Sequence, residues 1–270
     1  MSTITSLHNP HVRSAVRLRD RRHRERHGRI LIDGARELGR ALAAGVRLVE
    51  VFVCRPLCQS EEARRALAAL ADSPAKVLEV TEAVFEKLAF GDRTEGVLGV
   101  AETPALALAD LPRPDRPLVA VLEGLEKPGN VGAVLRSADA AGVSALIVAD
   151  PGTDLYNPNA IRASLATIFT VPTAAATTAE TLAWLRGHKL AIYAARLDAT
   201  LAYTEADYRR PAAIVLGSEA RGLSGAWSAG DVTAVRLPML GRADSLNVSA
   251  AAAVLFYEAL RQRTSGPGAR

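Results

Sequence analysis

Residues that could do chemistry gather in three short segments in the second half of this chain. Asn130 and Arg136 belong to "KPGNVGAVLRSADAAG", Glu219 to "IVLGSEARGLS", and Ser245 and Asn247 to "GRADSLNVSAAAAVLFYEAL". Amide, hydroxyl and carboxylate groups bind and orient polar substrates, and a guanidinium stabilises negative charge. One side chain is enough to cap a helix start, so the polar cluster in the last segment exceeds what the fold needs.

Several familiar kinds of site are disfavoured by spacing. Four of the five histidines lie within the first 27 residues, which argues against a Ser-His-Asp hydrolase. The glycines at 124, 129 and 132 do not have dinucleotide-fingerprint spacing, and no Gly-Lys-Ser/Thr follows for a phosphate loop. Cys54 and Cys58 have no second Cys or His pair nearby, so we expect ordinary thiols and no metal site.

Each candidate residue also has a purely structural interpretation. Asn130 would cap a helix or hold its loop, with Arg136 projecting from the second turn of that helix. Glu219 in a first helical turn is favoured by the helix dipole alone. Ser245, Asn247 and Ser249 would each be able to cap the helix that follows, whereas in the functional interpretation Ser249 alone serves the fold.

The elements that must position these residues follow from apolar runs. Strand-like runs at 29–34, 47–53, 76–80 and 97–102 alternate with helical patterns, which predicts a small α/β domain. A second series of runs is apolar throughout, at 117–124, 144–150, 167–172, 189–195, 211–217 and 231–238. Such runs, separated by helices, predict a parallel sheet covered on both faces. Ligands of these sheets bind at the carboxyl ends of the strands.

Prolines and charge divide the chain further. Pro104, Pro112, Pro114 and Pro117 indicate an extended linker. We therefore expect a basic arm at 1–28, an α/β domain at 29–104, a linker at 105–117 and a second domain at 118–270.

The basic arm carries eight arginines between Arg13 and Arg29 against Asp20 and Glu25. Dense guanidinium groups are typical of phosphate binding, although a solvated helix face would look similar. We expect six of these arginines to contact nucleic acid, namely Arg13, Arg17, Arg21, Arg22, Arg24 and Arg26.

Composition predicts a folded protein of the cytoplasm. About half of the 270 residues are apolar, and the net charge is +4. No apolar run is long enough to span a bilayer, and the basic start lacks the hydrophobic segment of a signal peptide.

The three polar segments, in this order and spacing, resemble the motifs of SpoU or TrmH-type RNA ribose 2'-O-methyltransferases of the SPOUT superfamily. The resemblance covers nearly the whole chain. It implies an α/β fold whose C-terminal parallel-sheet domain contains a trefoil knot, preceded by a ribosomal-protein-like RNA-binding domain. It also implies S-adenosylmethionine as cofactor and a homodimer, for which the apolar final helix at 249–263 is suited.

The resemblance further implies residue roles. Arg136 matches the catalytic arginine, for which a permanently charged guanidinium favours electrostatic stabilisation over proton abstraction. Asn130 and Glu219 would orient the loop and arginine, and Ser245 and Asn247 would position the ribose. The expected cofactor contacts are Gly217, Leu237, Leu246 and, with weaker support, Ala195.

Alternatives remain at the level of substrate and activity. The separate N-terminal domain favours 23S ribosomal RNA, in a housekeeping or antibiotic-resistance modification, over transfer RNA. An inactive rRNA-binding protein would retain the basic arm, and a nucleotide-dependent oxidoreductase would instead bind a nicotinamide cofactor.

Overall fold

The protein forms two compact units in a computed structural model that describes residues 3–90, 95–112 and 114–265. The N-terminal unit comprises Met1–Pro104 and Asp154–Thr170, and the C-terminal unit comprises Ala105–Thr153 and Val171–Arg270. The segment Asp154–Thr170 lies inside the range that we expected for the second domain, yet it packs with the first unit.

The N-terminal unit is built on a four-stranded sheet in the order β1-β4-β2-β3. Strands β1 and β2 each pair antiparallel with β4, and β2 pairs parallel with β3. The strands are β1 (Arg29–Asp33), β2 (Leu48–Val53), β3 (Lys76–Glu79) and β4 (Val97–Glu102). The helices are α1 (Pro10–Arg17), α2 (Arg21–His27), α3 (Ala35–Ala43), α4 (Glu61–Ala69), α5 (Glu82–Leu88) and α7 (Pro158–Ala163), with short 3-10 turns at Arg55–Leu57, Leu70–Asp72 and Thr167–Phe169.

Apolar stripes of α1 and α5 close one face of this sheet. Val12 and Leu18 meet Phe85 and the sheet residue Phe52 in one buried cluster. Asn9 caps α1 and Asp20 caps α2, and Gly28 ends α2 with a φ of 56°. Because that conformation disfavours side chains with a Cβ, glycine suits the turn from the arm into β1.

The C-terminal unit contains a seven-stranded sheet in the order β7-β6-β5-β10-β8-β11-β9, and its strand pairs are parallel. The strands are β5 (Leu118–Glu123), β6 (Ala145–Ala149), β7 (Thr173–Ala176), β8 (Ala191–Ala195), β9 (Leu201–Ala202), β10 (Ala212–Leu216) and β11 (Val232–Arg236). The helices are α6 (Pro128–Ala140), α8 (Thr178–Gly187) and α9 (Val248–Thr264), with 3-10 turns at Leu108–Asp110, Tyr203–Glu205 and Gly225–Ser228.

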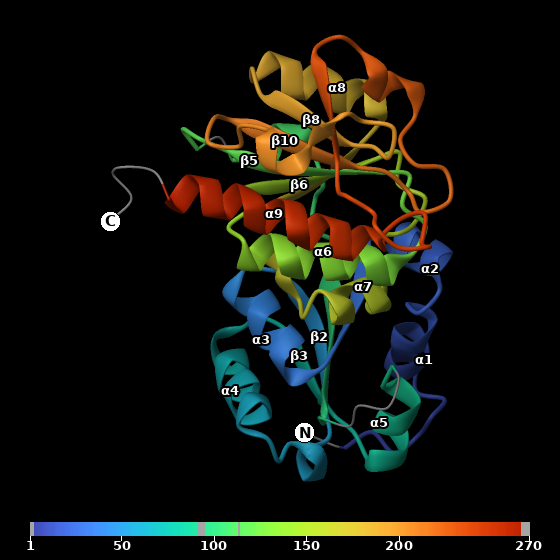
Figure 1. The fold of residues 1–270 in the computed structure, drawn as a ribbon. Coiled ribbons are helices and arrows are strands. Elements are labelled where there is room, and N and C mark those ends of the chain that lie inside the picture. Colours follow the sequence, from blue (N-terminus) through green and yellow to red (C-terminus); the bar gives the residue numbers. More distant parts are fainter. Residues whose placement is uncertain (1–2, 91–94, 113, 266–270) are drawn as a thin grey trace. The chain divides into compact units, whose positions relative to one another are not determined.

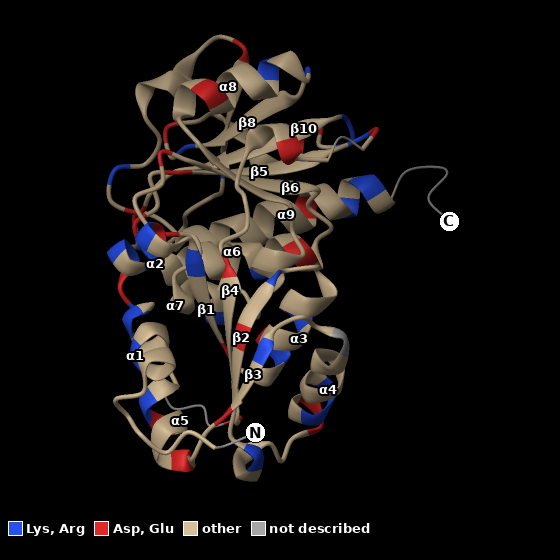
Figure 2. Ribbon diagram, turned by 180° about the vertical axis from the view of Figure 1, so that it is seen from behind, with Lys and Arg blue, Asp and Glu red and all other residues tan. Residues whose placement is uncertain are grey.

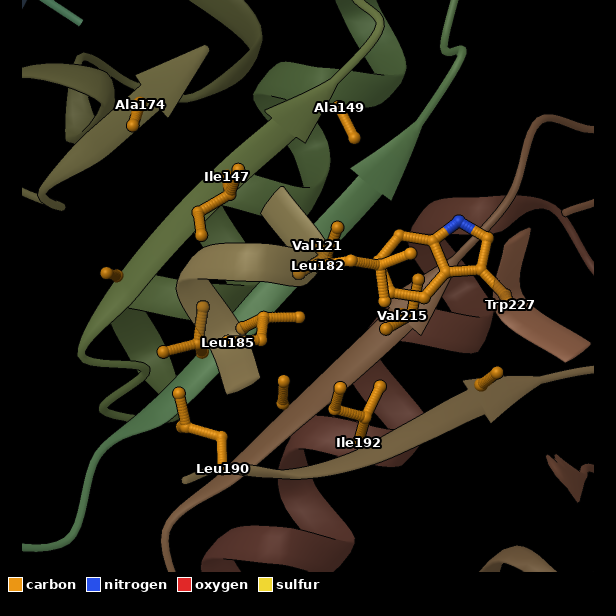
Figure 3. Packing of buried hydrophobic residues seen from close by; sticks show 14 of the residues in the cluster. Val121, Ile147, Ala149, Ala174, Leu182, Leu185, Leu190, Ile192, Val215 and Trp227 are labelled. Atoms are coloured by element: carbon orange, nitrogen blue, oxygen red, sulfur yellow. The ribbon is translucent and has the colours of Figure 1, made fainter. Parts of the chain in front are cut away.

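Helices cover both faces of this parallel sheet. Figure 1 shows α6 and α9 side by side on one face and α8 on the other. Under α8, Leu182 and Leu185 pack on Val121 and Ile147 beside the buried ring of Trp227 (Figure 3). Burial on both faces explains why the strands carry continuous apolar runs. The predicted α/β class with a parallel sheet is confirmed.

One predicted strand is wrong. The run at 167–172 contains a 3-10 turn at Thr167–Phe169, and the strand β7 follows at Thr173–Ala176. Ala166 precedes the turn with a φ of 63°, which interrupts extended backbone. Within the part of the chain that the structure describes, no helix combines the length and hydropathy of a membrane span.

Candidate functional site

A cavity of about 430 Å³ lies at the carboxyl ends of strands β8, β10 and β11. Parallel strands end on the same edge of a sheet, so segments distant in sequence meet there. Its walls include each residue expected to contact a cofactor, namely Ala195, Gly217, Leu237 and Leu246. Two of the expected catalytic residues, Glu219 and Ser245, also line it.

The lining combines apolar and charged groups. Leu197, Leu216 and Met239 add to the apolar surface, and Arg196 and Asp244 add charge. The volume falls within the range of small-molecule sites, which are mostly apolar with a few fixed polar groups. Leucine and valine side chains suit the faces of an adenine, and carboxylates suit a sulfonium or ammonium cation. These residues therefore fit S-adenosylmethionine by size and chemistry.

One wall of the cavity is formed by residues 217–222 of a tight loop at 217–224, here called the cavity loop. The backbone N–H of Gly222 donates to the Ser218 carbonyl at 2.9 Å, which closes the turn. A Cβ at Gly217 would lie 2.2 Å from the carbonyl carbon of Gly222. Only glycine fits at position 217, because its backbone touches the far side of the loop.

Glu219 of the cavity loop joins the three polar segments through hydrogen bonds. Its Oε1 accepts from the side-chain amides of Asn130 at 3.0 Å and Asn247 at 2.5 Å. Its Oε2 accepts from the Lys127 ammonium at 3.0 Å. The hydrogen bond from Lys127 holds the pKa of the Glu219 carboxyl below its usual value, so the group is ionised at neutral pH.

Asn130 and Asn247, the two asparagines that donate to Glu219, occupy different positions in their helices. Helix α6 begins at Pro128 with Lys127 at its N-cap, so Asn130 lies in the first turn and does not cap. Asn247 is the N-cap of α9, and its Oδ1 accepts from the backbone N–H and the hydroxyl of Ser249 at 2.9 and 2.6 Å. The expectation that Ser249 alone serves the fold is therefore wrong, because Asn247 both caps α9 and donates to Glu219.

Arg136 stands on the exposed side of α6 and does not line the cavity. We expected Arg136 in the second turn of a helix that begins at Asn130. Since α6 begins at Pro128, Arg136 lies in its third turn. Among the described residues, no ion pair holds its guanidinium. The structure thus connects Asn130, Glu219 and Asn247 through hydrogen bonds, and Arg136 is not part of this network.

The basic arm is presented by α1 and α2, where Figure 2 shows a concentration of Lys and Arg. Five of its selected arginines are exposed, namely Arg13, Arg17, Arg21, Arg22 and Arg26. Arg24 differs, since it is only 3% exposed. Its guanidinium donates to the Asp154 carboxylate at 2.5 Å and to the carbonyls of Leu18 and Arg19. Arg24 therefore fixes α2 within its unit and does not face solvent.

Lys127 is a contact of Glu219 that the sequence did not single out. It is the first residue of the segment that contains Asn130 and Arg136, but a lysine before Pro128 indicates no chemistry by itself, and the structure shows its contact with Glu219.

Burial raises the pKa of both Cys54 and Cys58, which keeps them protonated. In residues 3–90, 95–112 and 114–265, no three His, Cys, Asp or Glu side chains are grouped as metal ligands.

Comparisons with known proteins agree with this geometry. Residues 117–257 match the model of the SpoU rRNA Methylase family, and residues 9–99 match that of the MRM3-like substrate binding domain. A 23S rRNA (uridine(2479)-2'-O)-methyltransferase of Streptomyces viridochromogenes is 34% identical over 185 residues, which are 65% of this chain and 64% of that protein. The alignment thus spans less than two thirds of that relative.

Two solved structures extend the likeness to nearly the whole chain. An RNA 2'-O ribose methyltransferase is 45% identical with a TM-score of 0.85, covering 97% of this chain and 99% of its own. The SpoU methyltransferase AviRb from Streptomyces viridochromogenes, solved with AdoMet, is 28% identical with a TM-score of 0.86, covering 96% and 100%. The family expected from the three segments is confirmed, and the chain belongs to the SpoU rRNA Methylase family.

Proposed function

We propose that this protein transfers a methyl group from S-adenosylmethionine to a ribose 2'-hydroxyl of RNA. The observation that carries the proposal is the joining of the three family segments at one cavity by Glu219, which accepts from Asn130 and Asn247. The solved relative AviRb, which has AdoMet bound, supports the choice of cofactor.

The cofactor would occupy the cavity at the strand ends. Gly217 allows a close approach of backbone, and Ala195, Leu237 and Leu246 would surround the bound molecule. When bound, S-adenosylmethionine supplies an electrophilic methyl group on its sulfonium. The protein's part is then to exclude water from the cavity and to hold the RNA hydroxyl in line.

A ribose hydroxyl is a weak nucleophile, so its developing negative charge needs a partner. We assign this role to the Arg136 guanidinium, which also suits contact with the adjacent phosphate. Ser245 and Asn247 would hold the ribose at the mouth of the cavity. Glu219 orients Asn130 and Asn247 through the hydrogen bonds described above.

We infer that 23S ribosomal RNA is the substrate. The basic arm (1–28) and the domain at 29–104 would bind it, since the exposed arginines of α1 and α2 suit a phosphate backbone. The match of residues 9–99 to a substrate binding domain and the 23S rRNA activity of the Streptomyces viridochromogenes relative support this inference. Such a substrate implies a cytoplasmic protein.

The proposal includes the trefoil knot and the homodimer of the family. Residues of the segment at 237–246 line the same cavity as the cavity loop before the chain enters α9, and this is the part of the chain where we expect the knot. On α9, Val254 and Tyr257 are 39% and 51% exposed. These apolar side chains suit the interface between two copies.

An isotope-labelled methyl transfer assay tests the activity. Wild-type protein should label 23S rRNA, and Arg136→Ala should abolish labelling while binding S-adenosylmethionine normally. Full activity of the Arg136→Ala variant would refute the assignment of that residue. A wild-type protein that binds rRNA without labelling it would favour an inactive binding protein, and one that binds a nicotinamide cofactor instead would favour the oxidoreductase.

Mapping identifies the substrate. Sites of 2'-O-methylation should be compared in 23S rRNA and in transfer RNA from cells with and without the gene. We expect one 23S position to lose its methyl group when the gene is absent. A change confined to transfer RNA would overturn the choice of substrate but not the activity.

A further inference from the structure

Glu123 is a buried carboxylate to which the proposed chemistry gives no part. It is the last residue of β5, in a strand whose residues are all buried, and only 6% of it is exposed. Burying a charged group is costly unless it is fully hydrogen-bonded. An apolar residue could be buried at this position at a lower cost in free energy, so the carboxylate must perform a function that an apolar side chain could not.

Three donors converge on this carboxylate. Its Oε2 accepts from the backbone N–H of Ser224 at 2.7 Å. Its Oε1 accepts from the hydroxyls of Ser224 and Thr178, each at 2.8 Å. Burial alone raises the pKa of Glu123, but the hydrogen bonds outweigh it, and the pKa lies below its usual value. Glu123 is thus ionised and accepts three hydrogen bonds, two of them from Ser224.

Ser224 is the last residue of the cavity loop, and the other parts of that loop have their own attachments. The loop begins directly after β10, which pairs with β5 and β8. Its middle is held at Glu219 by Lys127, Asn130 and Asn247. Its far end is held by Glu123, through both the backbone and the side chain of Ser224.

We propose that Glu123 is a positioning residue that fixes the far end of the cavity loop and so maintains the shape of the cofactor cavity and the placement of Glu219. The proposal rests on the proposed function for the identity of the cofactor. Its structural part, the control of the cavity loop by a carboxylate beneath it, does not depend on any ligand.

Thr178 supplies a matched control. It lies at the start of α8, and its hydroxyl donates to Oε1 of Glu123, the same oxygen that accepts from the Ser224 hydroxyl. Thr178 does not line the cavity. Thr178→Val therefore removes one buried hydrogen bond of Glu123 and leaves both bonds to Ser224 in place. Glu123→Gln keeps the shape of the side chain but replaces one acceptor oxygen by a donor, which sets an N–H against the donors of Ser224 or Thr178.

The first measurement uses amide hydrogen exchange on the full-length protein without cofactor. We expect amides of the cavity loop to exchange at least about tenfold faster in Glu123→Gln, since about 1.4 kcal/mol of local stability corresponds to tenfold. The same amides should exchange at the wild-type rate in Thr178→Val. Unchanged exchange in Glu123→Gln would overturn the proposal whether or not the protein is a methyltransferase.

The second measurement is the dissociation constant for S-adenosylmethionine by calorimetry, together with the thermal midpoint of each variant. Glu123→Gln should bind about tenfold more weakly and Thr178→Val within about twofold of wild type, even where the two lose similar thermal stability. If the two variants lose affinity in proportion to their loss of thermal stability, the effect is on stability alone and the positioning role of Glu123 is overturned. A wild-type protein that fails to bind S-adenosylmethionine would refute the proposed function, and the exchange result would then decide the structural part alone.

Discussion

Replacing Asn247 by Asp separates its two duties. The Asn247 side chain accepts from the Ser249 N–H with Oδ1 and donates to Glu219 with Nδ2 at 2.5 Å. Aspartate caps a helix as well as asparagine does, and its charge suits a helix N-terminus. Helix α9 should therefore stay folded, while the group facing Glu219 changes from a donor to a carboxylate.

The energetic effect has two contributions. Loss of a hydrogen bond to a charged acceptor costs about 1.5–3 kcal/mol. Two carboxylates about 4 Å apart repel by about 1–4 kcal/mol between the dielectric limits of water and a protein surface. The Glu219 side chain is 29% exposed and keeps Lys127 as a partner, so it can turn away and relieve part of this repulsion. We take a net effect of about 2–2.7 kcal/mol on the catalytic arrangement, or roughly thirty- to hundredfold in rate.

The assay is labelled methyl transfer to 23S rRNA, with circular dichroism to follow helix content. Asn247→Asp should lose roughly thirty- to hundredfold in rate with helix content unchanged. Ser249→Ala is the matched control, because it removes a hydrogen bond to Asn247 without touching Glu219, and its rate should stay near that of wild type. Wild-type rates in Asn247→Asp would refute the reasoning, since the amide would then be needed only as a cap.

Three further perturbations follow from packing, burial and charge. Gly217→Ala should abolish cofactor binding measured by calorimetry, because the new methyl would lie 2.2 Å from backbone of the cavity loop; normal affinity would contradict that loop geometry. Burial raises the pKa of Asp33 from 3.8 to about 6, so the folded state holds more protons between these values and stability falls as pH rises through them. Asp33→Asn should remove this dependence and stabilise the protein at pH 8 by up to about 3 kcal/mol in urea unfolding, and equal stability of the two proteins at pH 8 would argue against it. Combined Arg17→Ala and Arg22→Ala should lower the salt dependence of rRNA binding by about one counterion per residue, whereas Arg64→Ala on α4 should not.

Much of the site could be predicted from sequence because its residues follow strong local patterns. Continuous apolar runs marked the parallel strands, and the ends of such strands meet at one edge. Gly217 and Leu246, expected to contact one ligand, do line the same cavity. The family and the fold class expected from the motifs are confirmed by comparison with known proteins.

What could not be predicted depends on contacts between distant residues. Lys127 and Glu219 are far apart in sequence, and neither carries a pattern that names the other. From the sequence, a glutamate at a strand end is expected to be exposed. The burial of Glu123 depends on its hydrogen bonds to Ser224, which is distant in sequence. Strand β7 consists of Thr and Ala, which lack the branched and aromatic side chains that mark strands.

The pairing of Arg24 with Asp154 has a consequence for the order of synthesis. Helix α2 and its buried arginine emerge from the ribosome long before Asp154 and α7, although all of them belong to the N-terminal unit. A nascent chain that stops at residue 104 holds a buried cation without its carboxylate and a strand β1 without the packing of α7. The N-terminal unit can therefore reach its final form only after the first two strands of the C-terminal sheet, β5 and β6, have been translated.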